Sequence, residues 1–168
     1  FTWMVTAAGA THICLRKVDP AQILSLARAE RVTALCAAPT VLIGLAHTPA
    51  TLRVDVPAGV RVLTAGAPPA AATIDAIENG LGWQITQAYG LTETAPFITV
   101  CEPRPEHAAL DPAARAALKA RQGVELITSG ELRVVDTEGV EIPWDGESRG
   151  EIVVRGNVVM EGYYNDPD

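Results

Sequence analysis

The sequence predicts an α/β protein in which a βαβ-type layered sheet is followed by a β-rich segment. Up to about residue 100, short apolar runs typical of strands alternate with segments of helical periodicity. After about residue 123, strand-like runs are separated by turn residues. A hydrophobic fraction of 48% and a charged fraction of 20% exclude disordered, collagen-like and coiled-coil chains. We therefore expect a partial α/β subdomain over residues 1–101, a loop–helix connection over 102–122 and a partial β-rich subdomain over 123–168.

The first strand–helix–strand unit is signalled by Asp19-Pro20. Asp is a favoured N-cap and Pro a favoured first helical residue, so a helix is expected to run from here to about Glu30. Apolar runs over residues 11–15 and 32–37 flank this helix and predict strands. Such a unit is typical of a parallel sheet.

The alternation then continues. We expect a helix over 39–46, a strand over 60–64, a helix over 70–79 that is ended by Gly80 and Gly82, and a strand over 83–87.

The character of the sequence changes after residue 101. Residues 102–112 are rich in Pro, Glu and His and predict a loop, and residues 113–121 predict a short, mostly polar helix. Strands are expected over 131–135 and 151–155, with a turn at 136–139.

Charge and cysteine usage narrow the function classes. The chain has 20 Asp and Glu against 13 Lys and Arg, a net charge of −7, which argues against nucleic acid or an anionic membrane as a partner. Cys14, Cys36 and Cys101 form no C-x-x-C pair, so free buried thiols in a reducing cytoplasm are expected rather than a disulfide or a metal site. Residues 32–52 carry no formal charge, but their prolines and threonines favour a buried strand and helix over a membrane span.

Two expected turns could carry chemistry, because ligands of open α/β sheets bind at the carboxyl ends of the strands. Residues 64–69 (T-A-G-A-P-P) are small, so the backbone can approach a flat ligand, although many ordinary turns look the same. Residues 87–94 (Q-A-Y-G-L-T-E-T) offer an aromatic face, a hydroxyl for a phosphate oxygen and a carboxylate for Mg²⁺. A polar loop with a buried tyrosine is the plain alternative.

The second turn resembles a known family. Y-G-L-T-E at 89–93 resembles the nucleotide-binding motif of the AMP-forming adenylating enzymes, which include acyl-CoA synthetases, aryl-CoA ligases, luciferases and peptide-synthetase adenylation domains. G-E-I-V-V-R-G at 150–156 and V-M-E-G-Y-Y-N-D-P at 159–167 resemble a second block of that family. A-G-A-P at 65–68 and A-P-T at 38–40 fall where the family has its adenine-side loop and the turn ahead of its acyl pocket.

The resemblance implies the large domain of the adenylate-forming fold and a two-step reaction. A carboxylate attacks the α-phosphorus of Mg²⁺·ATP to give an acyl-adenylate, and a thiol, usually coenzyme A, then takes the acyl group. Thr92 and Glu93 are the implied catalytic residues, Thr92 at the α-phosphate and Glu93 on the Mg²⁺. The implied nucleotide-binding residues are Gly66, Ala67, Pro68, Gln87, Ala88, Tyr89, Gly90, Leu91 and Thr92. The implied acyl-pocket residues are Gly66, Gly90, Leu91 and Thr94. The block at 150–167 is expected to be structural, with a ligand contact by Arg155 or Tyr163 as the alternative.

The resemblance also implies what the chain lacks. The chain begins at Phe1 without an initiator Met, so we expect it to be an internal piece of a longer cytoplasmic enzyme. The resemblance implies a phosphate loop upstream of this piece and a ribose-binding Asp, a hinge and a catalytic Lys downstream. The piece alone is expected to be inactive and to self-associate through uncovered surface, with a homodimer as one form.

The residues leave the substrate class partly open. The segment K-A-R-Q-G-V at 119–124 and the small uncharged pocket residues favour a fatty or aryl acid. The alternatives are another adenylate-forming branch, either carrier-protein-loading or luciferase-like, a degenerate non-catalytic nucleotide-binding module, and a generic doubly wound binding domain.

Overall fold

A computed structural model describes residues 2–166 of the chain. The strands are β1 (Ala34–Cys36), β2 (Arg61–Thr64), β3 (Gln84–Tyr89), β4 (Thr99–Cys101), β5 (Val124–Glu125), β6 (Glu131–Val135) and β7 (Glu151–Arg155). The α-helices are α1 (Thr2–Ala7), α2 (Pro20–Ala29), α3 (Pro39–Ala46), α4 (Ala71–Leu81) and α5 (Pro112–Lys119). Short 3-10 turns are η1 (Ala50–Leu52), η2 (Thr92–Thr94) and η3 (Pro105–Ala109).

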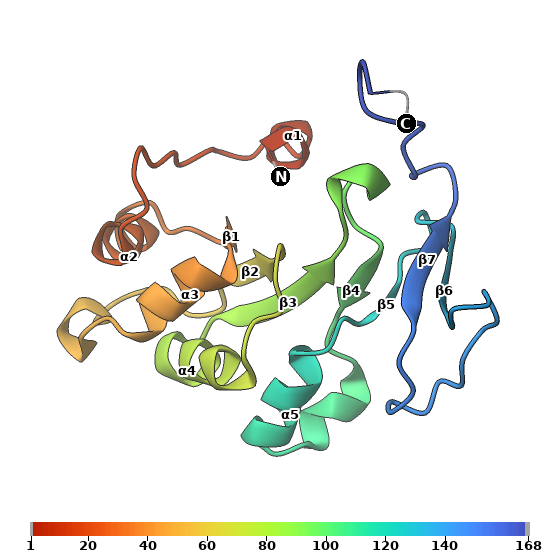
Figure 1. The fold of residues 1–168 in the computed structure, drawn as a ribbon. Helices are drawn as coiled ribbons and strands as arrows, with labels where there is room; N and C mark the ends of the chain where they lie inside the picture. Colours follow the sequence, from red (N-terminus) through yellow and green to blue (C-terminus); the bar gives the residue numbers. More distant parts are fainter. Residues whose placement is uncertain (1, 167–168) are drawn as a thin grey trace.

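The strands form a five-stranded sheet in the order β1-β2-β3-β4-β5 and a separate β6–β7 pair (Figure 1). β1, β2 and β3 are parallel, which confirms the predicted βαβ layer. β4 and β5 run antiparallel to their neighbours, and β6 pairs antiparallel with β7. Strand β5 lies in the region expected to be the β-rich subdomain but pairs with the first sheet. The subdomain boundaries themselves stay a prediction.

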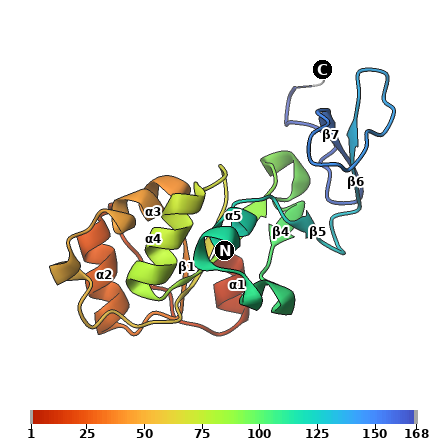
Figure 2. The same cartoon turned by 90° about the horizontal axis from the view of Figure 1, so that it is seen from below.

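Helices α2 to α5 gather on one face of the five-stranded sheet, and α1 lies on the other side (Figures 1 and 2). The core therefore forms between the sheet and the four helices. Its fully buried apolar side chains each contribute about 1.5–3 kcal/mol by leaving water. They include Leu24, Leu42, Leu45, Val60, Val62, Ile74, Ile77, Trp83 and Ile85.

Local signals in the sequence set the helix ends. The Asp19 carboxylate accepts hydrogen bonds from the amides of Ala21 and Gln22, so it caps α2 as predicted. Gly82 ends α4 with a φ of 66°, a left-handed conformation that glycine adopts without a Cβ penalty. The predicted helices at 39–46, 70–79 and 113–121 are confirmed as α3, α4 and α5, with small shifts at their ends.

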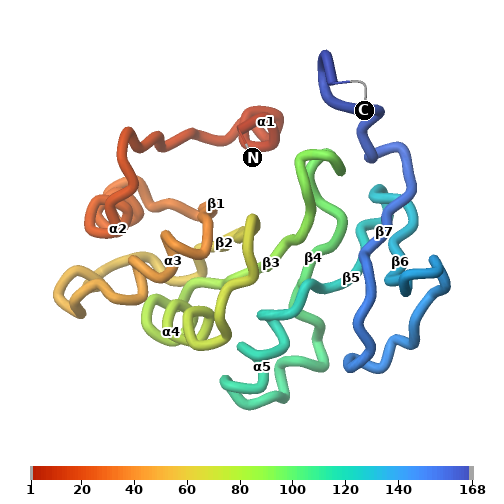
Figure 3. Tube along the Cα trace, in the orientation of Figure 1, coloured from red at the N-terminus to blue at the C-terminus, as the bar shows by residue number. Residues whose placement is uncertain are grey.

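The predicted strand over residues 11–15 is wrong. The segment pairs with no described strand and runs as an irregular stretch between α1 and α2 (Figure 3). It stands off α2 and β1, and a cavity of about 560 Å³ lies between them. A strand needs a neighbour to satisfy its backbone groups, and an apolar run alone does not supply one.

The burial predicted for the thiols is correct only for Cys101. Cys14 and Cys36 are exposed, because Cys14 lies on the irregular stretch and Cys36 lies on edge strand β1. β1 is also shorter and more exposed than the predicted buried strand over 32–37. The structure further adds α1, β4 and the 3-10 turn η3, which the sequence had not indicated.

The uncharged stretch over 32–52 folds as β1, α3 and η1, in agreement with the non-membrane interpretation. Within residues 2–166, each helix is too short or too polar to cross a bilayer.

Candidate functional site

The two turns singled out in the sequence leave the same edge of the sheet. β2 and β3 are adjacent and parallel, and Thr64 is the register partner of Gln87. Adjacent strands lie about 4.8 Å apart, so the turn after Thr64 and the loop after Tyr89 start side by side. Gly66, Ala67 and Pro68 are exposed, and Tyr89 is half-buried. The structure thus brings the aromatic ring and the small-residue turn to one edge.

Glycine is required at one position of each turn. Gly66 has a φ of 92°, which a residue with a Cβ adopts only with strain, and nothing lies within 4 Å of where a Cβ would stand. At Gly90 the restriction comes from packing, because a Cβ would lie 1.8 Å from the carbonyl oxygen of Pro96. The loop after β3 therefore folds back tightly on itself, and the turn after β2 leaves its backbone open.

Thr94 braces the loop from inside. Thr94 is buried, and its hydroxyl makes two hydrogen bonds to Leu91. The hydroxyl oxygen accepts from the Leu91 amide at 3.0 Å, and the hydroxyl donates to the Leu91 carbonyl oxygen at 3.0 Å. These two bonds stabilise η2, which is one 3-10 turn long, and Leu91 and Thr92 remain exposed. The hydroxyl available to a ligand at the mouth of this loop is therefore that of Thr92.

Glu93 is held from two sides by the segment that follows β7. The Met160 amide donates to the Glu93 carbonyl oxygen at 2.9 Å, and the Tyr163 hydroxyl donates to Glu93 Oε1. The bond from Tyr163 lowers the pKa of Glu93 below its ordinary value, and the same bond raises the pKa of Tyr163. Glu93 is therefore a carboxylate at neutral pH, with the phenol as the donor.

A lone carboxylate of this kind suits Mg²⁺ better than a metal that needs a full protein cage. Among residues 2–166, no group of three or more His, Cys, Asp or Glu side chains is arranged to hold a metal. Mg²⁺ keeps several waters and is bound through one or two carboxylates together with substrate phosphates. Glu93 is ionised and half-buried, so it fits that mode of binding.

Gln87 and Ala88 lie deeper than the other predicted site residues, with 1% and 0% of their surface exposed. Gln87 Nε2 donates to Gln122 Oε1 at 3.3 Å, and Thr99 Oγ1 donates to the Gln122 carbonyl oxygen at 2.6 Å. Gln87 Oε1 has no hydrogen-bond partner within residues 2–166. Side-chain contact with a ligand at this edge is thus open to Tyr89 and Thr92, whereas Gln87 and Ala88 are buried within the sheet.

Sequence reasoning missed two contacts of the site. Gln122 belongs to the segment at 119–124 that favours a fatty or aryl acid as substrate. Nothing in the sequence around Gln122 indicates that its side chain pairs with that of Gln87. Tyr163 was an alternative ligand contact, and the structure joins it to Glu93 instead. Arg155, the other alternative, donates to Glu131 across the β6–β7 pair at 2.8 Å. Pro167, the last residue of the second block, lies outside the described residues.

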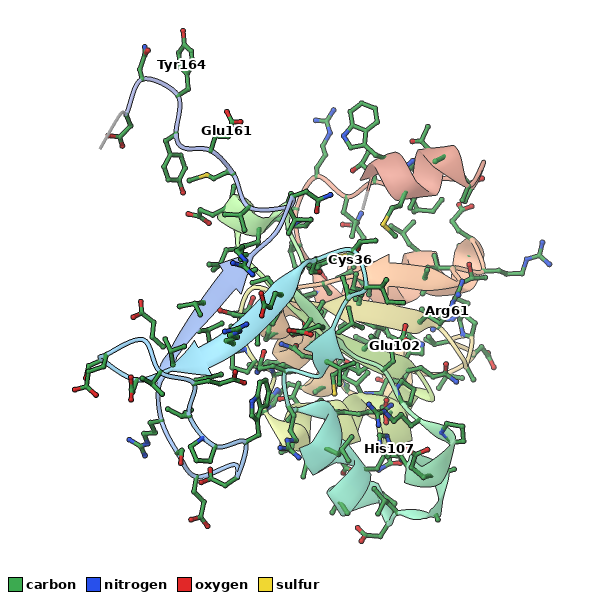
Figure 4. The ribbon with its side chains drawn as sticks, turned by 90° about the vertical axis from the view of Figure 1, so that its right-hand side faces the viewer. Cys36, Arg61, Glu102, His107, Glu161 and Tyr164 are labelled. Carbon is green, nitrogen blue, oxygen red and sulfur yellow. The ribbon has the colours of Figure 1, made fainter. Side chains whose placement is uncertain are left out.

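A hollow of about 780 Å³ lies elsewhere, lined by parts of β1, β2 and β3, by α4 and α5 and by the segment after β4, and it shares no residue with the two turns. Its lining includes Arg61, Glu102 and His107, which come from β2 and from the segment after β4 (Figure 4). This hollow is therefore separate from the edge that carries the motif.

Comparison with known proteins identifies the chain. The sequence model described as "AMP-binding enzyme" matches residues 1–164. The chain belongs to the AMP-binding enzyme family. That result confirms the resemblance carried by the motifs at 65–68, 89–93 and 150–167.

Several named relatives of this AMP-binding chain are acid–CoA ligases. A 4-hydroxybutyrate–CoA ligase of Metallosphaera sedula is 44% identical over 168 residues, which is 100% of this chain and 30% of the relative. A peroxisomal acetate/butyrate–CoA ligase of Arabidopsis thaliana is 39% identical over 100% of this chain and 30% of its own length. The chain thus spans about 30% of the length of the curated relatives it matches.

Solved structures agree on the fold. An amide bond synthetase from Marinactinospora thermotolerans is 32% identical, with a TM-score of 0.76 over 96% of this chain and 30% of that one. A benzoate CoA ligase from Burkholderia xenovorans has the same TM-score over 97% of this chain and 31% of that one, and its 21% identity supports the fold alone. The parallel sheet with an added antiparallel pair is accordingly that of an adenylate-forming enzyme.

Proposed function

We propose that the protein carrying this chain is an ATP-dependent, AMP-forming carboxylic acid–CoA ligase. It would form an acyl-adenylate and pyrophosphate first and then pass the acyl group to the thiol of coenzyme A. The main support is that the Y-G-L-T-E loop leaves β3 beside the small-residue turn of β2 in a member of the AMP-binding family. Such an enzyme works by positioning its reactants and stabilising charge.

In this proposal the edge of the sheet binds the nucleotide. Tyr89 stacks on the adenine, whose other face meets the exposed backbone of 66–68, and Gln87 and Ala88, which are buried in β3, lie along the polar edge of the base. Thr92 contacts the α-phosphate, and Glu93 holds the Mg²⁺, which would neutralise phosphate charge. Both side chains lie in η2, so a single short turn would carry the two catalytic groups.

The acyl group would lie beside Gly66, Gly90 and Leu91. Leu91 is half exposed at the mouth of the loop, and Thr94 stands behind it with its hydroxyl already bonded to the Leu91 main chain. The names of the relatives, which refer to 4-hydroxybutyrate, to acetate or butyrate and to 2-methylpropanoate, favour a short-chain acid within the broader fatty or aryl class.

The chain alone is proposed to be inactive. Residues 64–95, which hold both turns, contain no Lys or Arg. Transfer at a phosphorus needs cationic groups on the phosphates in addition to the metal, and these would have to come from elsewhere in the protein.

A cytoplasmic location is likewise a proposal, and two of the similar plant enzymes are named as peroxisomal. Self-association of the chain also stays a prediction.

A second acceptor is a specific alternative. The amide bond synthetase is 32% identical to this chain, so an amine in place of the CoA thiol is the competing second step. Both versions share the adenylation step. Product analysis with coenzyme A or an amine present separates them.

The test is carboxylate-dependent ATP–pyrophosphate exchange by the full-length protein with short-chain, longer-chain and aromatic acids. We expect exchange with a subset of acids and a loss of about 100-fold or more in Glu93→Gln, because the variant removes the metal ligand. Glu138→Gln, which changes an exposed carboxylate in the turn at 136–139, is the matched control and should retain exchange. Exchange that survives Glu93→Gln would refute the assignment. A folded protein that binds ATP but exchanges with no acid would instead be a nucleotide-binding module.

A further inference from the structure

The loop that carries Glu93 is tied to the β6–β7 part of the molecule by hydrogen bonds from residues distant in sequence. Met160 and Tyr163, both after β7, bond to the main chain and the side chain of Glu93. Ser129, just before β6, is buried and donates through Oγ to the Phe97 carbonyl oxygen at 3.0 Å. The loop after β3 and the segment after β7 therefore form one bonded unit.

The bonds fix Glu93 more completely than its own turn would. A glutamate side chain has three rotatable bonds and samples several rotamers when it is free. Here the Met160 amide fixes the main chain of residue 93, and the Tyr163 phenol fixes Oε1. Within residues 2–166, no hydrogen bond engages Glu93 Oε2, so one carboxylate oxygen is held and the other is available.

We propose that Tyr163 is a positioning residue for the metal ligand Glu93. Its hydroxyl holds one oxygen of the carboxylate so that the other is presented to the metal of the metal·ATP complex. This inference rests on the proposed function, because it takes Glu93 as the metal ligand. Tyr163 itself touches neither the metal nor the nucleotide in this scheme.

The arrangement couples metal binding to the segment after β7. If Tyr163 favours the metal-binding rotamer of Glu93, then bound metal must stabilise the Tyr163 contact to the same degree, since coupling between two sites is reciprocal. The Met160 amide, which is bonded to the same residue, should then exchange its hydrogen more slowly when metal·ATP is present. A tyrosine that only packs against the loop would produce no such link.

The test uses the full-length protein and Mn²⁺ as the metal probe. Tyr163→Phe removes only the hydroxyl, and Tyr163 is 54% exposed, so the variant should fold. The neighbouring Tyr164 is 94% exposed and points away from the body of the molecule (Figure 4), so Tyr164→Phe is a matched control. Free Mn²⁺ is measured by electron paramagnetic resonance with ATP present. Hydrogen exchange is followed in peptides that cover residues 156–166.

We expect Tyr163→Phe to weaken Mn²⁺ binding in the ternary complex about 10-fold, the scale of losing a partner that orients a metal ligand. It should also abolish the slowing of exchange by Mn²⁺·ATP. Tyr164→Phe should match the unchanged protein in both measurements. Unchanged Mn²⁺ binding in Tyr163→Phe would overturn the proposal, even if thermal stability falls, because lower stability alone indicates a merely structural role.

Glu93→Gln separates this inference from the proposed function. If Glu93→Gln weakens Mn²⁺ binding and Tyr163→Phe does not, then Glu93 is the ligand and Tyr163 does not position it. If neither variant changes Mn²⁺ binding, the metal role of Glu93 fails, and the inference about Tyr163 fails with it.

Discussion

The ion pair between Lys119 and Glu78 gives the sharpest prediction about stability. It joins α5 to α4, with the Lys119 side chain 8% exposed and the Glu78 side chain 17% exposed. Glu78 Oε1 also accepts the Ile85 amide hydrogen of β3 at 2.9 Å. One carboxylate thus ties two helices to the central strand of the sheet.

Lys119→Met keeps the apolar stem of the side chain and removes the ammonium group. Removing one partner of a fully buried pair costs about 3–5 kcal/mol. Because Glu78 retains some contact with water and its bond to Ile85, we expect about 2–3 kcal/mol. In the double variant Lys119→Met/Glu78→Gln, the amide oxygen still accepts from Ile85 and no charge is left buried. We expect that variant to lose only about 1 kcal/mol.

Urea unfolding followed by tryptophan emission measures these differences. Trp83, directly before β3, is 1% exposed, whereas Trp3 and Trp144 are 85% and 71% exposed. Within this chain, the emission change therefore reports mainly on the region of the ion pair. Two results would refute the reasoning. One is a loss below about 0.5 kcal/mol in Lys119→Met, typical of a surface pair. The other is a double variant that unfolds at lower urea than the single one.

Two further predictions concern the loop after β3 and the β-rich part. Gly90→Ala should lose about 3 kcal/mol or more, because its Cβ would meet the Pro96 carbonyl oxygen, whereas Gly139→Ala, with open space around it, should lose only about 1–2 kcal/mol for its positive φ. Equal losses in urea unfolding would contradict the packing argument. The amides of Ser148 and Glu147, followed by the Ser148 hydroxyl, lower the pKa of Asp145 from its ordinary value of 3.8 to about 2. A carboxyl group whose pKa is lowered in the folded protein stabilises the fold at pH values above its ordinary pKa, and this stabilisation is lost as the pH falls through the lowered pKa. The difference in unfolding midpoint between the protein and Asp145→Asn should therefore be full at neutral pH and shrink between about pH 4 and pH 2. A difference independent of pH would be inconsistent with this shift.

Features specified by neighbouring residues could be predicted from the sequence. Asp19 before Pro20 fixes the start of α2, and Gly82 fixes the end of α4, because each acts within one turn of helix. The position of the Y-G-L-T-E loop at the end of β3 followed from the apolar run before it and from the motif itself. These signals need no knowledge of what packs against them.

Features that depend on distant partners could not be predicted in this way. The run at residues 11–15 has the composition of a strand but has no neighbour to pair with, and β4, only three residues long, exists because β3 and β5 flank it. The bond between Tyr163 and Glu93 joins residues 70 positions apart, and no local pattern indicates it. For the candidate site, the sequence therefore indicated the two turns, whose role in binding stays a prediction, and missed the contacts that hold Glu93 and Gln87.

The reversal of strand direction between β3 and β4 also bears on how the chain folds. Tyr89 pairs with Thr99 across a short connection, whereas Thr64 reaches its partner Gln87 only after a helical crossover. Closing a short loop costs less chain entropy than closing a long one, so local antiparallel pairs can form before parallel ones. The loop with Tyr89 and Glu93 lies inside the most local pairing of the five-stranded sheet. We therefore expect its hairpin to be among the earliest structures in refolding, ahead of the crossovers that bring the turn after β2 alongside it.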